Sequence, residues 1–258
     1  MMKEGAKRMN GKGWRSMTLV VAVTTLLSAS PITHEDAHAA TFTHTGILYS
    51  QEDFDRAKTN VASGASPWIE AWEVAKLSKY ASPTYTPSAV AAPARYGSGA
   101  SSGNQQLFDD STAALTQAII WKVSDNAAEA ATAKTRAQLI LDTWANTVNT
   151  AVGGDENHLL AGLTAYKLAA AADIMRADGT WVSSGKLAKV QTMLKTYFYP
   201  PLKTFLANHQ GKNNGTAYPY YYRGNQDQAA LISMMAIGVL CDDLNIYNEA
   251  VTGYKSGA

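Results

Sequence analysis

The chain has 258 residues, and its 22 basic and 21 acidic side chains give a formal net charge of +1 at pH 7. A chain so close to neutral offers no broad basic surface, which argues against nucleic acid and anionic membranes as partners. Its single cysteine, Cys241, excludes an internal disulfide and fits a small core residue better than a redox site.

The first 39 residues have the three-part pattern of a secretory signal peptide. The basic segment MMKEGAKRMNGKGWRSM precedes the apolar run TLVVAVTTLLSAS, and Ala37–His38–Ala39 is an A-x-A cleavage pattern. The apolar run is too short to span a bilayer, although an uncleaved anchor or a core helix is the alternative. We therefore expect residues 1–39 to be removed and residues 40–258 to form one domain that is secreted or periplasmic.

Hydrophobic spacing is helical nearly throughout the rest of the chain. The first helix is expected in SQEDFDRAKTNVA, where Ser50 and Asp53 form a capping-box pattern. Residues 81–106 are rich in proline and glycine and predict a long loop, which is often functional. Further helices are expected in SPWIEAWEVAKLSKY, DDSTAALTQAIIWKVSD, AAEAATAKTRAQLILDTWANTV, LLAGLTAYKLAAAADIMR, KLAKVQTMLKTYFYP (ended by Pro200) and QAALISMMAIGVLCDD.

No segment alternates as a strand does, so the sequence predicts an all-α fold. Long helices with short connections favour antiparallel helical hairpins. A bundle, a solenoid and a closed α/α toroid all satisfy this pattern, and periodicity alone does not choose among them. The absence of an obvious repeat at fixed spacing weakens the regular solenoids.

Several segments, taken in order, resemble the alginate lyase domain family of polysaccharide lyases. They are FTHTGILYSQEDFDRAK, LILDTWANTV, LLAGLTAYKLAAAADIMR, FYPPLKTFLANHQ and, most strongly, GNQDQAALISMMAIGVLCDDLNIYNEAV. The resemblance covers about Phe42 to Ala258. It implies an (α/α) toroid and cleavage of a uronate-containing polysaccharide, such as alginate or glucuronan, by β-elimination.

The sequence departs from the family pattern at two places. Position 226 is Gln, where relatives usually carry Trp or His. Relatives also continue past the point that corresponds to Ala258, through a helical block that closes the toroid and supplies catalytic residues. The resemblance therefore implies an incomplete toroid and a chain that is poorly active alone. It leaves the identity of the catalytic base open, with positions beyond Ala258 among the possibilities.

The stretch YPYYYRGNQDQ contains the residue types that β-elimination needs. Removing the C5 proton of a uronate adds charge beside a carboxylate, so hydrogen-bond donors or cations must neutralise that carboxylate, while Tyr or His transfers protons. The candidate catalytic residues are Asn225, His209 and Tyr222. The candidate substrate-binding residues are Arg223, Gln226, Arg95 and Tyr221.

Each candidate also has a purely structural interpretation. Asn225, with Gln228 three residues later, makes a good helix N-cap, and His209 at a helix end can simply meet the helix dipole. Arg95 can be a solvated loop residue, and some of the tyrosines can be core. Asp242 and Asp243 are expected to terminate or cap helices. No clustered metal-ligand pattern is present, so neither metal nor cofactor is expected.

Two other functions compete with the exported lyase. A glycoside hydrolase on the same scaffold would need an acid and a base carboxylate. A non-catalytic glycan-binding protein is favoured by Gln226 and by the missing C-terminal block. In each case the expected partner is a polysaccharide, acidic for the lyase, and the expected state is a monomer.

Overall fold

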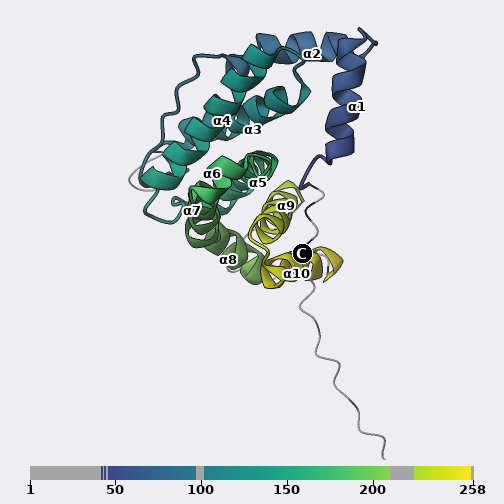
Figure 1. Cartoon of the computed structure of the whole chain (residues 1–258). Helices are drawn as coiled ribbons and strands as arrows, with labels where there is room; N and C mark the ends of the chain where they lie inside the picture. Colours follow the sequence, from purple (N-terminus) through teal and green to yellow (C-terminus); the bar gives the residue numbers. More distant parts are fainter. Residues whose placement is uncertain (1–41, 43, 45, 97–101, 210–223, 257–258) are drawn as a thin grey trace, which may run out of the picture. The chain divides into compact units, whose positions relative to one another are not determined.

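The computed structural model describes residues 42, 44, 46–96, 102–209 and 224–256 (Figure 1). Within these residues the chain is all-α, as the hydrophobic spacing predicted, and contains no strand. The only strand-like pairings among them are isolated bridges from Ala94 to Gly103 and to Gly153. Residues 40–258 pack into one unit. The predicted signal peptide, residues 1–39, lies outside the described part.

Short connections join most of the helices. In chain order they are α1 (Gln51–Ala62), α2 (Trp68–Leu77), η1 (Lys79–Ala81), α3 (Asn104–Val123), α4 (Ala127–Thr147), α5 (Asn157–Met175), α6 (Gly179–Ser183), α7 (Lys186–Met193), η2 (Leu194–Phe198), α8 (Tyr199–His209), α9 (Asn225–Leu240) and α10 (Leu244–Ser256). The capping box at Ser50 is confirmed, because Ser50 Oγ accepts from Asp53 N and the Asp53 carboxylate accepts from Ser50 N. Helix α3 begins at Asn104, so the predicted loop of residues 81–106 is slightly shorter than expected.

The expectation that Pro200 ends a helix was wrong. The chain stays helical from α7 through η2 into α8, and η2 is a π-helical segment directly before Pro200 and Pro201. A proline inside a regular α-helix clashes with the carbonyl four residues earlier. The wider π-helical turn relieves such crowding, so the helical path continues.

Helices α3, α5 and α9 run parallel to one another. Between α5 and α9, His158 contacts Gln226 at one end and Arg176 contacts the carbonyl of Leu240 at the other. Between α3 and α5, the residues just before both helices pair with Ala94. At their C-terminal ends, Lys122 and Asp173 line one pocket. The three helix starts therefore share one end of the molecule.

The intervening helices return in the opposite direction. Trp144, near the end of α4, donates to Asp110, near the start of α3. The helical path of α7, η2 and α8 begins near the end of α9, where Gln191 donates to the carbonyl of Leu240. It finishes near the start of α5, where Phe205 stacks on His158. Helix α4 and the α7–α8 path thus run opposite to α3, α5 and α9.

Small residues let α5 and α9 approach closely, and these two helices lie side by side in Figure 1. A Cβ atom placed on Gly162 would lie 2.9 Å from the backbone carbon of Ala229. Ser233 Oγ donates to the carbonyl of Gly162 at 2.7 Å and accepts from Tyr166 N at 3.0 Å. This buried hydroxyl joins the two backbones and fixes their register.

A buried carboxylate anchors the loop between η1 and α3. Asp110 is 2% exposed and accepts hydrogen bonds from Tyr85 Oη at 2.7 Å, Ser88 N at 2.8 Å and Trp144 Nε1 at 2.7 Å. Burial and the adjacent carboxylate raise the pKa of Tyr85, so its hydroxyl stays a donor. The loop is therefore held against α3 and α4 before it reaches Arg95.

The packing of α5 on α9 predicts that Gly162→Ala is destabilising. The added methyl group must push the Ala229 backbone away, at a cost of about 1–3 kcal/mol, although alanine is the better helix former. Chemical denaturation should show a lower free energy of unfolding. Gly179→Ala is the matched control, because a Cβ there meets nothing within 4 Å. Equal stability of the two variants would contradict this account.

Cys241 is a free, half-buried thiol at the end of α9, less buried than a core residue would be. Burial raises its pKa to about 12, so at pH 8 very little of it is the reactive thiolate. We predict that iodoacetamide alkylates the native protein at least ~100-fold more slowly than the urea-unfolded chain. Labelling at similar rates in both states would show that the thiol is accessible and ionised.

Candidate functional site

The loop that carries Arg95 is fastened to the entry of α5. Arg95 N donates to the carbonyl of Gly153 at 3.1 Å, and Glu156 N donates to the carbonyl of Arg95 at 3.2 Å. Gly154 makes this approach possible, because it has a φ of +88° and a Cβ there would lie 2.2 Å from the Arg95 oxygen. The predicted substrate-binding residue Arg95 therefore sits at the N-terminal end of the parallel helices.

The Arg95 side chain is partly buried and has a partner. Its Nε donates to Glu156 Oε2 at 2.8 Å. Its guanidinium carbon lies 5.1 Å from the ring centroid of Tyr96 and 5.8 Å from that of Phe108. The interpretation of Arg95 as a freely solvated loop residue is therefore wrong. Cation–π contacts and one ion pair through Nε orient the guanidinium group. Its terminal nitrogens are the donors that could bind a substrate carboxylate.

The start of α9 meets the start of α5 through Gln226 and His158. Gln226 Oε1 lies 2.6 Å from His158 Nε2, so a hydrogen bond joins the two side chains. The imidazole is 2% exposed and stacks on Phe205 with a centroid distance of 4.0 Å. Sequence reasoning missed His158. Its position at the first turn of a helix after the glycine-rich GGDEN stretch was the signal available.

Asn225 is the first residue of α9 rather than its cap, so the capping interpretation was wrong. Gly224 occupies the N-cap position, and Asp227 accepts from Gly224 N at 3.2 Å. Asn225 is exposed, and its amide makes no hydrogen bond to another described residue. The amide is therefore available to a ligand at this end of the molecule.

The remaining candidate site residues lie wholly or partly outside the described residues. His209 is the last residue of α8, and its side chain lies outside the described part, as do Tyr221, Tyr222 and Arg223 entirely. Arg95 and Gln226 both lie against the start of α5, through Glu156 and His158 respectively.

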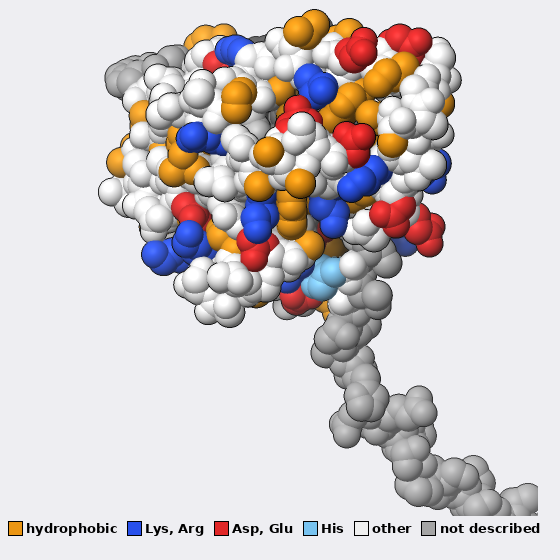
Figure 2. Space-filling model, turned by 45° about the horizontal axis from the view of Figure 1, so that its top comes forward, with side chains coloured by type: hydrophobic (Ala, Val, Ile, Leu, Met, Phe, Trp, Pro, Cys, Tyr) orange, Lys and Arg blue, Asp and Glu red, His pale blue; other side chains and the backbone are white. Residues whose placement is uncertain are grey.

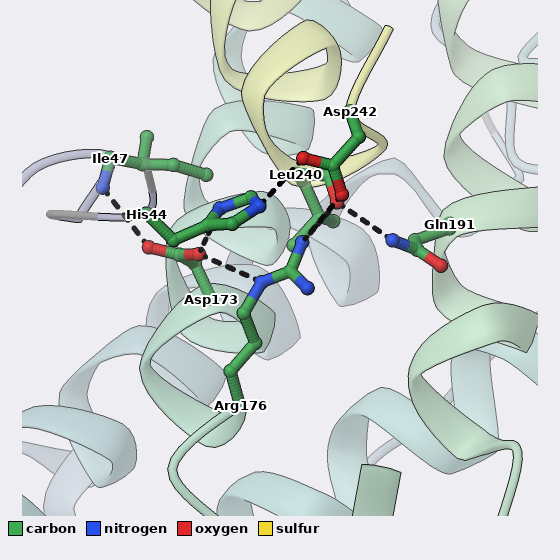
Figure 3. A network of polar contacts seen from close by, with 7 residues as sticks. All are labelled: His44, Ile47, Asp173, Arg176, Gln191, Leu240 and Asp242. Carbon is green, nitrogen blue, oxygen red and sulfur yellow. Dashed lines mark hydrogen bonds and ion pairs between the residues drawn. The ribbon is translucent and has the colours of Figure 1, made fainter. Parts of the chain in front are cut away.

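A charged network occupies the opposite end of the same helices (Figure 3). Asp173 accepts from Ile47 N and from Arg176 Nε, both at 3.1 Å. His44 lies between two carboxylates, with Nε2 2.7 Å from Asp242 and Nδ1 3.7 Å from Asp173. This network ties the segment before α1 to the ends of α5 and α9.

The aspartates after α9 have separate roles. Asp242 joins this network from a left-handed backbone position, with a φ of +52°. Asp243 accepts from Asn245 N and Ile246 N, both at 3.2 Å, and so caps α10. Asp242 also terminates α9, because its N–H donates to the carbonyl of Val239 at 3.3 Å. The expectation that these residues terminate or cap helices is therefore confirmed for both.

A pocket of about 620 Å³ lies beside this network, and none of the predicted site residues lines it. Its wall includes Tyr49, Phe54, Lys122, Asp173 and Arg176. Figure 2 shows that hydrophobic, basic and acidic side chains are interspersed on the face drawn there. The pocket and the Arg95–Gln226 cluster are therefore two distinct features at opposite ends of the parallel helices.

Comparisons with known proteins do not identify the chain, because no family model, curated protein or solved structure matches it. Within the described residues, no group of three or more histidine, cysteine or acidic side chains is arranged to hold a metal ion. No helix among them has the length and apolar character needed to cross a bilayer.

The contact between His158 and Gln226 predicts that Gln226→Leu lowers the free energy of unfolding more than Gln228→Leu does. Gln226→Leu removes the hydrogen-bond partner of a buried ring nitrogen and should lower the free energy of unfolding by about 1–3 kcal/mol. Gln228→Leu, at an exposed position two residues farther along α9, should change it by less than about 0.5 kcal/mol. Thermal and urea denaturation of both variants measure this. Two equal effects would show that the contact contributes nothing.

Proposed function

We propose that the protein is an exported polysaccharide lyase that cleaves a uronate-containing polymer by β-elimination. The observation that carries the proposal is that four polar residues lie at the N-terminal ends of α5 and α9, two of them in direct contact. The four are Arg95, His158, Asn225 and Gln226. The ordered resemblance to the alginate lyase domain family supports the same reaction.

The arrangement of the helices is compatible with an (α/α) toroid, the finer fold that we propose. In such a fold, the helices of one layer run parallel and the chain returns through a second layer. Helices α3, α5 and α9 run parallel to one another, as the helices of the first layer do. Helix α4 and the α7–α8 path run in the return direction, as the second layer does. A uronate polymer would then be cleaved at one end of the parallel layer.

Neutralising the uronate carboxylate is the main chemical demand of this reaction, and amide donors can meet it. His158 engages the oxygen of Gln226, so the amide NH₂ is the part of Gln226 left to donate. The exposed Asn225 amide adjoins it, and Arg95 supplies a positive charge. In a site that excludes water, such donors stabilise the dianion that forms when the C5 proton leaves. His209 and Tyr222 remain the proposed proton-transfer residues.

The remaining parts of the proposal come from the sequence. Residues 1–39 act as a signal peptide, so the mature protein is secreted or periplasmic. It acts as a monomer on an acidic polysaccharide. Tyr221 and Arg223 lie next to Tyr222 along the chain and bind flanking sugar units.

A single incubation with polyuronate separates the competing functions. A lyase generates a conjugated unsaturated uronate, seen as a rise in ultraviolet absorbance. New reducing ends without that rise would indicate a glycoside hydrolase. Binding with neither would indicate a glycan-binding protein, and both of these results would overturn the proposal.

Asn225→Asp tests the role of the exposed amide. An acidic residue in the first turn favours the helix dipole, so the melting temperature should hardly change. The substitution replaces a donor with a negative charge facing the uronate carboxylate. Losing one such donor typically costs ~10²–10³ in turnover, and repulsion adds to the loss. Turnover close to that of the unmodified protein would exclude Asn225 from the site, whatever the melting temperature shows.

A further inference from the structure

Two half-buried lysines stand out because no carboxylate pairs with them. Among the described residues, Lys122 and Lys167 are partly buried and form no salt bridge, whereas the equally buried Lys134 is paired with Asp178 at 3.2 Å. Burial lowers the pKa of both Lys122 and Lys167. A protein does not usually leave a partly desolvated ammonium group without an anion.

Aromatic rings and a hydroxyl surround the Lys167 ammonium. Its Nζ donates to Thr112 Oγ1 at 3.1 Å and lies 5.8 Å from the ring centroid of Phe108 and 5.9 Å from that of Tyr166. The Arg95 guanidinium also lies 5.8 Å from the Phe108 centroid. Phe108 is therefore shared by two cations, one of which belongs to the proposed active site.

Lys122 has a similar setting two or three helical turns farther along. Its Nζ lies 5.3 Å from the ring centroid of Trp121 and 5.8 Å from that of Phe54. Lys122 and Phe54 line the pocket of about 620 Å³ together with Tyr49. The wall also includes Glu52 and Asp173, the second of which is paired with Arg176. The part of the wall that suits an acidic sugar is therefore the side with the Lys122 ammonium group and the aromatic faces.

Both lysines lie where α3 faces α5. Five half-buried positions of α3 lie on one helical stripe, at a spacing of three or four residues. They are Phe108, Thr112, Leu115, Ile119 and Lys122. Thr112 contacts Lys167 of α5, and Lys122 shares its pocket with Asp173 and Ile174 of α5. Ten residues separate Thr112 from Lys122, which is about 15 Å along a helix. The two cations therefore mark a line that leads away from Arg95.

We propose that this line is a binding track for the substrate chain, in which Lys167 and Lys122 each bind a uronate carboxylate outside the cleavage site. The track rests on the proposed function and adds to it. The polymer passes from Arg95 over Lys167 to the pocket at Lys122, and the aromatic rings hold the faces of the sugars. A short oligouronate cannot reach both lysines, whereas a longer one does.

The test measures affinity and turnover on oligouronates of increasing length, with the full chain and with Lys167→Met and Lys122→Met. Methionine keeps the apolar stem and removes the charge. Charge-assisted hydrogen bonds of this kind contribute roughly 10- to 100-fold in affinity. Each variant should bind long oligouronates at least ~10-fold more weakly, and its affinity should also depend less on salt. Circular dichroism should be unchanged.

Lys189→Met is the matched control. Lys189 is exposed, pairs with no carboxylate and donates to Asn146 Oδ1 at 3.0 Å, much as Lys167 donates to a neutral oxygen. Neutral oligosaccharides of equal length should bind poorly to every form. If uronate is cleaved but the Lys167 and Lys122 variants behave as the control does, the track is wrong and the proposed function stands. If no form binds or cleaves polyuronate, both fail.

Discussion

The contact of α5 with α9 sets the position of nearly everything else that matters in this structure. Gly162 leaves no Cβ between the two backbones, and Ser233 bridges them from within. Once the register is set in the middle, the helix ends must coincide as well. Gln226 then meets His158 at one end, and Arg176 meets the carbonyl of Leu240 at the other.

Buried polar groups extend this order to the loops. The Asp110 carboxylate accepts hydrogen bonds from the Tyr85 hydroxyl, the Ser88 backbone amide and the Trp144 indole. It therefore joins the loop before α3 to α4. A buried carboxylate that lost these donors would be very unfavourable. The loop consequently has one defined path to Gly154, where its backbone meets the entry of α5. Arg95 is thereby held at the N-terminal end of α5, which also contacts Gln226 of α9 through His158.

The distribution of charge divides the partly buried cations into paired and unpaired groups. Most partly exposed lysines and arginines have a carboxylate nearby, including Lys134, Lys195 and Arg176. Lys122 and Lys167 instead rest on aromatic rings and carry desolvated charge. In a chain with almost no net charge, an acidic polymer would be attracted by such local groups rather than by an overall field.

The amino-acid sequence by itself determined the helices, the capping box at Ser50, the helix cap at Asp243 and the all-α class, since each depends on neighbours within a few residues. It did not predict the helical path through Pro200, the displacement of Asn225 from the cap, or His158. Only the tertiary structure decided those. Periodicity shows which face of a helix is apolar, but not which helix covers it. His158 and Gln226 are 68 residues apart along the chain, and only the close packing at Gly162 brings them together.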